Sequence, residues 1–526
     1  MEKRIEREEK EIINGALLLT VSMLIVKVFG LIYKVPLSYI LSDEGMGYFN
    51  TAYSVYTFFY VISTSGVPKA ISILTASSDE NSADEISFAA FRMFFVIGAV
   101  LTCVFVFLSS PISNALGSGG ASLAMLGIAP SIAFVSASGA LRGYFNGKLM
   151  LLPLAVSELI AGISKLVFGL VFAAWGEKIG LEIYEIAAFS ITGITLGSFF
   201  GFMYLFILMK KGAKKKRKKA VLRLNSDFNI LKKVLKISIP LTVSAAIGSL
   251  VNLLDVGLVM RTLRKTGFSE LQANIIYGNY TTLAVPMFNL VATLLAPVSA
   301  VLLPLLAKNA SHGNSIEFQK KTKLSLDISL FITVPIAFLF FGFSESILTF
   351  IFEDDSAKMA APLLSALSFS TVFMGMLLVI NTAIEGEGNY RVPLFSLTLG
   401  SLVKLLISAA LIPNDSFNIL AAPIGTAMSY ALSFTISYLY LNKVKKIRTP
   451  IFKNLIFTVT FSSAALLVSN FFNKNISLEN WFLKEVLTYS IFAFVYFTFI
   501  FIYFFLGKTR KKVYNCDKNP SHKLYI

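Results

Sequence analysis

Charged residues, cysteines and histidines are all scarce in this sequence of 526 residues. Charged residues make up 15% of the chain, whereas water-soluble proteins contain about 25%. Apolar residues make up 55% and are gathered in long runs. The sequence is therefore that of a polytopic membrane protein, and we expect it in the cell membrane.

The few cysteines and histidines argue against two kinds of site. Cys103 lies in an apolar run and Cys516 in the polar tail, so they offer neither a disulfide framework nor a metal-binding spacing. His312 and His522 lie in polar segments, which argues against a catalytic or zinc site built on histidine. The loops are short and lack the clustered acids, arginines or histidines that a membrane polymerase or glycosyltransferase needs. We therefore do not expect an enzyme.

The charge distribution argues against two further classes of protein. The N-terminal sequence MEKRIEREEKE has no small-residue cleavage site, so it is not a cleavable signal peptide. A net charge of +17 would suit a nucleic-acid partner, but no base-reading element is visible. The cytoplasmic loops of a membrane protein account for the same charge, and we expect no nucleic acid.

The long apolar runs predict an all-α membrane protein. A spanning helix needs about 20 mostly apolar residues. Pro286, Pro297 and Pro304 fall within one long run and predict kinks there. The sequence predicts about fourteen transmembrane helices, at residues 12–40, 46–75, 87–109, 121–145, 150–175, 184–209, 234–260, 275–306, 325–352, 360–385, 392–412, 418–441, 451–472 and 483–506.

The distribution of basic residues predicts the orientation of these spans. With both termini in the cytoplasm, the cytoplasmic segments hold thirty-three Lys and Arg and the outer segments seven. Because basic residues gather on the cytoplasmic side, this is the expected orientation. Two features fit it poorly: the cytoplasmic segment 77–85 is acidic, and the bases of 261–265 would lie outside.

Short matches indicate that the chain contains a repeat. Leu19–Ser22 recurs 222 positions later, Gly143, Asn146 and Lys148 match Gly386, Asn389 and Arg391, and Pro153 and Lys165 match Pro393 and Lys404. Their shared order predicts two parallel six-helix lobes with a substrate site between them and transport by rocking. We expect lobes at 1–209 and 234–441, a basic cytoplasmic linker at 210–233 that touches lipid headgroups, and two extra helices with a basic tail at 442–526.

Three lysines lie within the first two apolar runs. A lysine in the hydrocarbon core usually faces a water-filled cavity or a partner. Lys27 and Lys34 are seven residues apart and share a helix face, and Lys69 follows Gly66 and Pro68, which weaken the helix. These lysines predict a cationic cavity that holds an anion. The alternative is that Lys27 and Lys69 extend to the nearer membrane interface.

The same region carries a resemblance to a known family. Val28–Leu37 (VFGLIYKVPL), Gly45–Tyr48 (GMGY) and Ser65–Ser72 (SGVPKAIS) resemble the SpoVB/YtgP group of polysaccharide transporters. This group belongs to the multidrug/oligosaccharidyl-lipid/polysaccharide exporter superfamily, which includes the lipid II flippase MurJ. The resemblance is specific over residues 19–74 and general over the remainder.

The resemblance implies a flippase for undecaprenyl-pyrophosphate-linked sugars, with lipid II as the leading candidate. Its partners would be this lipid-linked oligosaccharide and membrane lipids, and we expect a monomer. In MurJ-like proteins, basic residues of the first two spans receive the pyrophosphate. Lys27 stands where such a family arginine would be, and Lys34 at or next to another. The predicted pyrophosphate-binding residues are Lys27, Lys34, Lys69, Arg261 and Arg264.

A second group of polar residues lies in the C-terminal half. Asp255, Asn381, Glu385 and Ser401 offer oxygen ligands that suit a hard cation such as Na⁺. Some MurJ-like proteins are similar in having a sodium site there, with one acid on the seventh span and an Asn/acid pair four apart. We expect no resident cofactor, but coupling to Na⁺ or H⁺ through these residues, with Na⁺ at Asp255, Asn381 and Glu385. Two alternatives are that Glu385 is a helix-end acid in contact with water and that Asp255 pairs with a lysine such as Lys404.

A further pair of charged residues has two interpretations. Glu158 and Lys165 share a helix face and either belong to the cavity or form ion pairs with neighbouring helices.

The alternative function is a cation-coupled multidrug exporter of the same superfamily. Such exporters usually have twelve spans and an acidic cavity, so the lysines count against it.

Overall fold

The computed structural model describes residues 2–76, 80–148, 150–213, 224–311, 315–352, 354–414, 417–444, 451–475 and 481–518. Within these ranges every regular element is a helix, and none is a strand. Parts of the acidic segment 77–85 and of the basic run 210–219 lie outside the described residues, as do His312, His522 and the side chain of Cys516.

The helices follow the apolar runs of the sequence. They are α1 (Glu2–Thr64), α2 (Val67–Ala76), α3 (Glu80–Leu116), α4 (Ala121–Ile128), α5 (Ser131–Gly147), α6 (Leu151–Lys178), α7 (Ile183–Ala213), α8 (Leu224–Lys265), α9 (Glu270–Asn279), η1 (Tyr280–Ala284), α10 (Val285–Ser311), α11 (Ser315–Gly342), α12 (Ser344–Thr349), α13 (Asp354–Gly386), α14 (Arg391–Leu411), η2 (Asn418–Leu420), α15 (Ala421–Leu439), η3 (Tyr440–Val444), α16 (Phe452–Asn475) and α17 (Trp481–Lys518).

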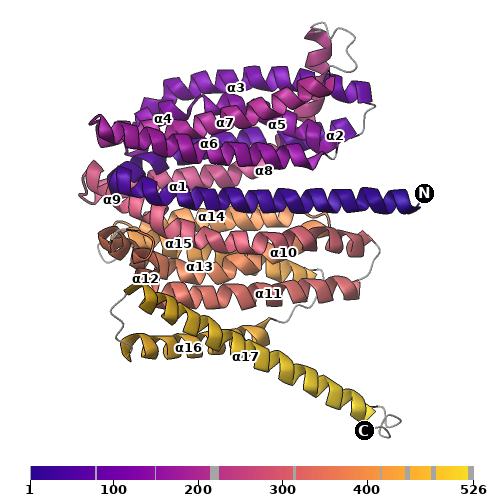
Figure 1. Ribbon diagram of the computed structural model, residues 1–526, viewed down its shortest axis with the longest axis vertical. Coiled ribbons are helices and arrows are strands. Elements are labelled where there is room, and N and C mark those ends of the chain that lie inside the picture. The colour runs from indigo at the N-terminus through magenta and orange to yellow at the C-terminus, as the bar shows by residue number, and fades with distance from the viewer. Residues whose placement is uncertain are drawn as a thin grey trace.

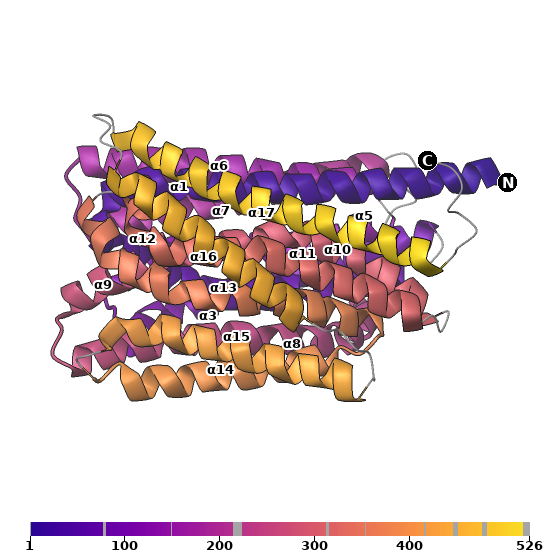
Figure 2. The ribbon, with the colours of Figure 1, turned by 90° about the horizontal axis from the view of Figure 1, so that it is seen from below.

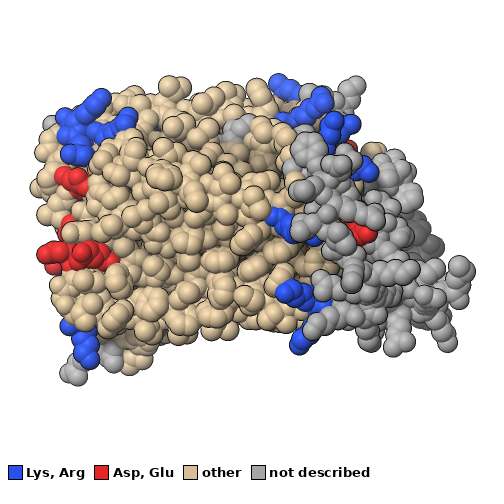
Figure 3. Space-filling model, turned by 90° about the horizontal axis from the view of Figure 1, so that it is seen from above, with Lys and Arg blue, Asp and Glu red and all other residues tan. Residues whose placement is uncertain are grey.

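Eleven helical stretches among the described residues are long and apolar enough to cross a membrane. One of them, Val28–Thr75, contains parts of the first two predicted spans, and the predicted spans 234–260 and 275–306 are not among the eleven. The protein is thus a multi-pass membrane protein, as predicted, but the count of about fourteen is not confirmed. Figure 3 shows charged side chains gathered at the two ends of the visible face, with an uncharged band between them.

The helices form two groups with a boundary between them (Figure 1). Helices α2 to α7 lie together in one group, α10, α11, α13 and α15 lie in the other, and α1, α8 and α14 run along the boundary. The last two helices pack against each other, and α16 also packs on α11 at the outside of the bundle (Figure 2). Helix α1 starts, and α17 ends, on the same side of the bundle (Figure 1).

The structure describes the two ends of the predicted linker 210–233. Helix α7 continues to Ala213, and α8 begins at Leu224. Both ends of the predicted linker are therefore helical. Helix α8 packs against α1, α2, α3 and α14, so it joins the two groups. The close approach of α2 and α8 requires Gly66, where a Cβ atom would lie 2.3 Å from the carbonyl oxygen of Ser238.

Local breaks in the helices position the residues at the boundary. The backbone of Ser42 has φ 54° and ψ −179°, so α1 is broken there by a kink. The helix is irregular beside Pro286, where the five-residue π-helix η1 ends directly before Val285. The side chains of Pro297 and Pro304 lie outside the described residues.

Candidate functional site

Lys34 on α1 reaches across the boundary to η1. Its Nζ donates a hydrogen bond of 3.3 Å to the carbonyl oxygen of Thr281. The π-helix leaves this carbonyl available, because the N–H of Val285 bonds to Tyr280 and the next residue, Pro286, has no N–H. The contact therefore follows from the proline in the sequence, and it joins the two groups of helices.

Lys165 on α6 is the second cation at this boundary. Its Nζ lies 5.2 Å from the ring centre of Tyr33 and 5.3 Å from that of Tyr53, both on α1. The close packing of α6 on α7 sets this position, since a Cβ on Gly193 would lie 2.5 Å from the backbone nitrogen of Gly169. Small residues permit such contacts between membrane helices. Tyr53 remains 37% exposed.

These two lysines have no carboxylate partner in the part of the chain that the structure describes. The ammonium groups of Lys34 and Lys165 lie near enough to repel each other. Among the salt bridges formed by the described residues, neither lysine takes part in any. Contacts with tyrosine rings contribute only about 0.5–2 kcal/mol each. Two neighbouring cations within the membrane-spanning part therefore make a site that favours an anion.

Asp255 on α8 is paired with a lysine. Its Oδ2 lies 2.7 Å from Nζ of Lys404 on α14, and its Oδ1 accepts a hydrogen bond of 3.4 Å from Oγ of Ser408. The two charged side chains are 10% and 16% exposed. Of the alternatives that the sequence left open for Asp255, pairing with Lys404 is the one found, and its negative charge is already compensated.

The predicted sodium ligands are not joined by contacts among the described residues. Oδ1 of Asn381 accepts a hydrogen bond from Ser437, and Asn381 and Glu385 line a cavity of about 310 Å³ with Tyr430. Among the contacts of the described residues, none joins Asp255 to this pair or to Ser401, which is half-buried on α14. Among the described residues, no group of three or more His, Cys, Asp or Glu side chains could hold a metal ion. A sodium ion bound by Asp255, Asn381 and Glu385 is not tested by these contacts and stays a prediction.

The other predicted basic residues are placed in different ways. The side chain of Lys27 lies outside the described residues. Lys69 on α2 is exposed and lies within electrostatic range of Glu385 on α13, so it too faces the opposite group. Arg261 is exposed. Arg264 donates a hydrogen bond of 3.5 Å to the carbonyl oxygen of Gly117, so it takes part in a contact between the groups.

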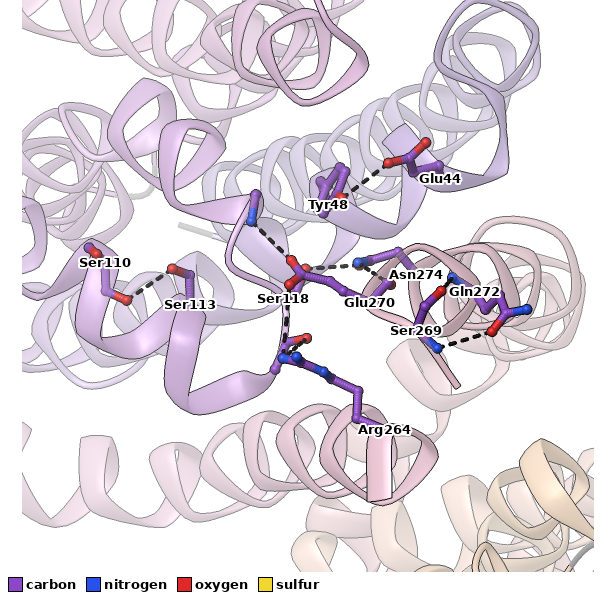
Figure 4. A network of polar contacts seen from close by, with 12 residues as sticks. Glu44, Tyr48, Ser110, Ser113, Ser118, Arg264, Ser269, Glu270, Gln272 and Asn274 are labelled. Atoms are coloured by element: carbon purple, nitrogen blue, oxygen red, sulfur yellow. Dashed lines mark hydrogen bonds and ion pairs between the residues drawn. The ribbon is translucent and has the colours of Figure 1, made fainter. Parts of the chain in front are cut away.

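One end of the boundary is closed by tight contacts (Figure 4). Oγ of Ser118 donates a 2.8 Å hydrogen bond to Oδ1 of Asn274 on α9, and the N–H of Gly120 donates to Glu270. A Cβ on Gly47 would lie 2.4 Å from the carbonyl oxygen of Asn274, and one on Gly278 would lie 2.2 Å from that of Asp43. Only glycine permits these approaches, so the sequence specifies closure at the end opposite the first residues of α1.

Comparison with known families places the chain. The family described as "Polysaccharide biosynthesis protein" matches residues 12–310. The chain belongs to this family. A second family, MatE, matches residues 281–410, which agrees with the superfamily predicted from the first two spans.

Curated relatives of this family member are of similar length. Stage V sporulation protein B of Bacillus subtilis (strain 168) is 21% identical over 426 residues, which cover 80% of this chain and 81% of the relative. Lipid II flippase MurJ of the same organism is 21% identical over 469 residues, covering 82% and 83%. A solved structure described as "Lipid II flippase MurJ, inward closed conformation" is 19% identical and covers 93% of this chain and 99% of that chain, with a TM-score of 0.70. The fold is that of a membrane transporter of this superfamily.

Sequence reasoning missed the partner of Glu158. On the basis of its helix face, Glu158 could share the cavity with Lys165, but it forms an ion pair with Arg142 on α5. Arg142 is one of the thirty-three Lys and Arg of the predicted cytoplasmic segments. The two side chains are 25% and 22% exposed, so they compensate each other and leave Lys165 free of Glu158. The only signal in the sequence for this ion pair was that Arg142 is a basic residue at the end of an apolar run.

Proposed function

We propose that this protein is a flippase for undecaprenyl-pyrophosphate-linked sugar precursors, either lipid II or a related polysaccharide intermediate. Such a flippase would serve cell-wall or spore-cortex peptidoglycan synthesis. The observation that carries the proposal is the pair of uncompensated lysines, Lys34 and Lys165, at the boundary of the two helix groups. Phosphate oxygens accept hydrogen bonds from ammonium groups, and these charge-assisted bonds are about twice as strong as neutral ones.

The headgroup would cross the membrane by alternating access. Lys34 binds the pyrophosphate while its hydrogen bond to Thr281 is exchanged for one to a phosphate oxygen. The two groups then rock, and the tight contacts around Gly47 and Asn274 open. The basic residues support an orientation in which both termini are cytoplasmic, so this closed end would be the outer one. No covalent bond is made or broken.

The polyprenyl tail would stay in contact with lipid. A groove of about 420 Å³ is lined almost entirely by apolar residues of α11, α13 and α16, among them Phe338, Phe369 and Val459. Burying a chain of methylene groups in such a groove is favourable by about 0.8 kcal/mol for each group relative to water. We assign this groove to part of the tail.

The MatE match over residues 281–410 favours a second candidate, a cation-coupled multidrug exporter. A cationic drug needs an uncompensated acid, and Asp255 is paired with Lys404. Coupling to Na⁺ or H⁺ stays a prediction for either function. Its test is transport in membrane vesicles under an imposed gradient of each ion. A rate that follows neither gradient would remove both ions from the mechanism.

The proposal is tested by depleting this protein in its host and measuring undecaprenyl-linked intermediates by mass spectrometry, with their membrane sidedness assayed. We expect a lipid-linked glycan to accumulate on the inner leaflet, and its identity names the substrate. Depletion in a strain that lacks other flippases is the control for redundancy. If no lipid-linked glycan accumulates in that strain, the proposed function is wrong.

A further inference from the structure

The sequence repeat relates three residues of one lobe to three of the other. The 222-residue offset of Leu19–Ser22 places Tyr33 at the position of Asp255. The 239-residue offset of Lys165 and Lys404 also places Gly169 at the position of Ser408. Neither set lies within one stretch of the chain, so only folding can bring its members together.

The structure assembles both sets in the same way. In the C-terminal set, Asp255 contacts Lys404 at 2.7 Å and accepts a hydrogen bond from Ser408. In the N-terminal set, Lys165 lies over the ring of Tyr33, and a Cβ on Gly169 would lie 2.6 Å from that ring. The serine that hydrogen-bonds the acid in one lobe is thus replaced by the glycine that makes room for the ring in the other.

The surrounding backbone supports this equivalence. A Cβ on Gly193 would lie 3.0 Å from the carbonyl oxygen of Lys165, and a Cβ on Gly425 would lie 3.1 Å from that of Lys404. Each lysine is therefore held by a close neighbouring helix with a glycine at the contact. The two lysines differ mainly in the residue opposite them, which is a carboxylate in one lobe and a phenol ring in the other.

We infer that Asp255 is a built-in anion that takes, at Lys404, the place that a substrate phosphate takes at Lys165. It thereby confines anion binding to the N-terminal lobe. This inference rests on the proposed function. Because the carboxylate belongs to the chain, its effective concentration beside Lys404 far exceeds the concentration of a free ligand. Even a ligand on a short flexible tether reaches an effective concentration of only about millimolar. Lys404 is thus a latent phosphate-binding residue, with Ser408 as a second donor.

A one-sided site has a consequence for transport. A pyrophosphate held by lysines of both lobes at once would link the lobes and oppose their rocking. With Asp255 in place, the phosphates bind Lys165 and Lys34, which both belong to the N-terminal lobe. The C-terminal lobe can then move relative to the bound anion without breaking an ion pair to it. Asp255 is in this sense a specificity-determining residue that never touches the substrate.

The test measures binding of inorganic pyrophosphate to the purified full-length protein by isothermal titration calorimetry. We expect the wild type to bind one equivalent, and Lys165→Met to weaken that binding at least about tenfold. Asp255→Asn should bind a second equivalent. The double variant Asp255→Asn/Lys404→Met should return to one equivalent, which a merely structural role for the ion pair would not produce.

The mirror-image variant tests the same inference without exposing a new unpaired lysine. Tyr33→Asp/Gly169→Ser copies the C-terminal set into the N-terminal lobe. We expect it to lose pyrophosphate binding although Lys34 and Lys165 are both present. If the wild type binds no pyrophosphate, the proposed function fails. If wild type and Lys165→Met behave as expected, but Asp255→Asn gains no equivalent and the mirror-image variant still binds, this inference alone is wrong.

Discussion

Replacing Lys165 by methionine should reduce transport without destabilising the protein. Methionine keeps the length of the apolar stem and removes the charge. A hydrogen bond to a charged group contributes about 1.5–3 kcal/mol, so losing one phosphate contact should slow transport by about 10–150-fold at limiting substrate. The free protein also loses the repulsion between Lys34 and Lys165. The loss of the contacts with the rings of Tyr33 and Tyr53 opposes this gain, so its melting temperature should change little.

The matched control is Lys404→Met, at the equivalent position of the other lobe. This change leaves the carboxylate of Asp255, which is 10% exposed, without its partner. Breaking a buried ion pair from one side costs about 3–5 kcal/mol, so the melting temperature of this variant should fall clearly. The assay compares transport by membrane vesicles and thermal unfolding in one detergent for both variants. Full transport by Lys165→Met, or equal destabilisation of the two variants, would refute this reasoning.

Three further changes test the geometry of the boundary and of one end of the bundle. Pro286→Ala restores a backbone N–H that can bond to the carbonyl oxygen of Thr281, which should then no longer accept a hydrogen bond from Lys34. Transport should therefore fall several-fold while helix content by circular dichroism is unchanged. Unaltered transport counts against the contact between Lys34 and Thr281. Gly47→Val should prevent Gly47 and Asn274 from approaching at the closed end. A reporter cysteine at position 274 should then react faster with a thiol reagent in Gly47→Val/Asn274→Cys than in Asn274→Cys alone. Equal rates contradict the closure. Burial lowers the pKa of Lys148, but the hydrogen bonds that it donates, above all the one to Asp84, outweigh burial and raise that pKa above the ordinary 10.5. Stability from this contact is therefore present below about pH 10.5 and lost above it, so the melting temperatures of wild type and Asp84→Asn should converge only at strongly alkaline pH; convergence already at neutral pH would contradict this assignment.

Much of the fold could be predicted from the sequence, because long apolar runs leave few alternatives to membrane helices. The lysines were also visible, because Lys34 and Lys165 are rare charges within such runs. Their partners were not. Asp255 could pair with Lys404 or bind a cation with Asn381 and Glu385, and only the distances between helices decide between these.

Other features of the site depend on contacts between the lobes. The repeat offsets already contained the equivalence of Tyr33 and Asp255, but a phenol and a carboxylate share no sequence similarity. The π-helix had a local signal in Pro286, yet nothing local indicated that its free carbonyl would meet Lys34. Closure at Gly47 depends on which helix packs against it. The spacing of residues within one apolar run does not predict that helix.

The most direct test of the central claim is translocation of a lipid-linked sugar by the purified protein in liposomes. Undecaprenyl-pyrophosphate-linked sugar is placed in the bilayer, and its arrival on the opposite leaflet is followed with an impermeant glycan-modifying enzyme. We expect the wild type to move the substrate and Lys34→Met/Lys165→Met, reconstituted at equal density, to be close to empty liposomes. Equal translocation by the wild type and this double variant would contradict the claim that the two lysines hold the pyrophosphate.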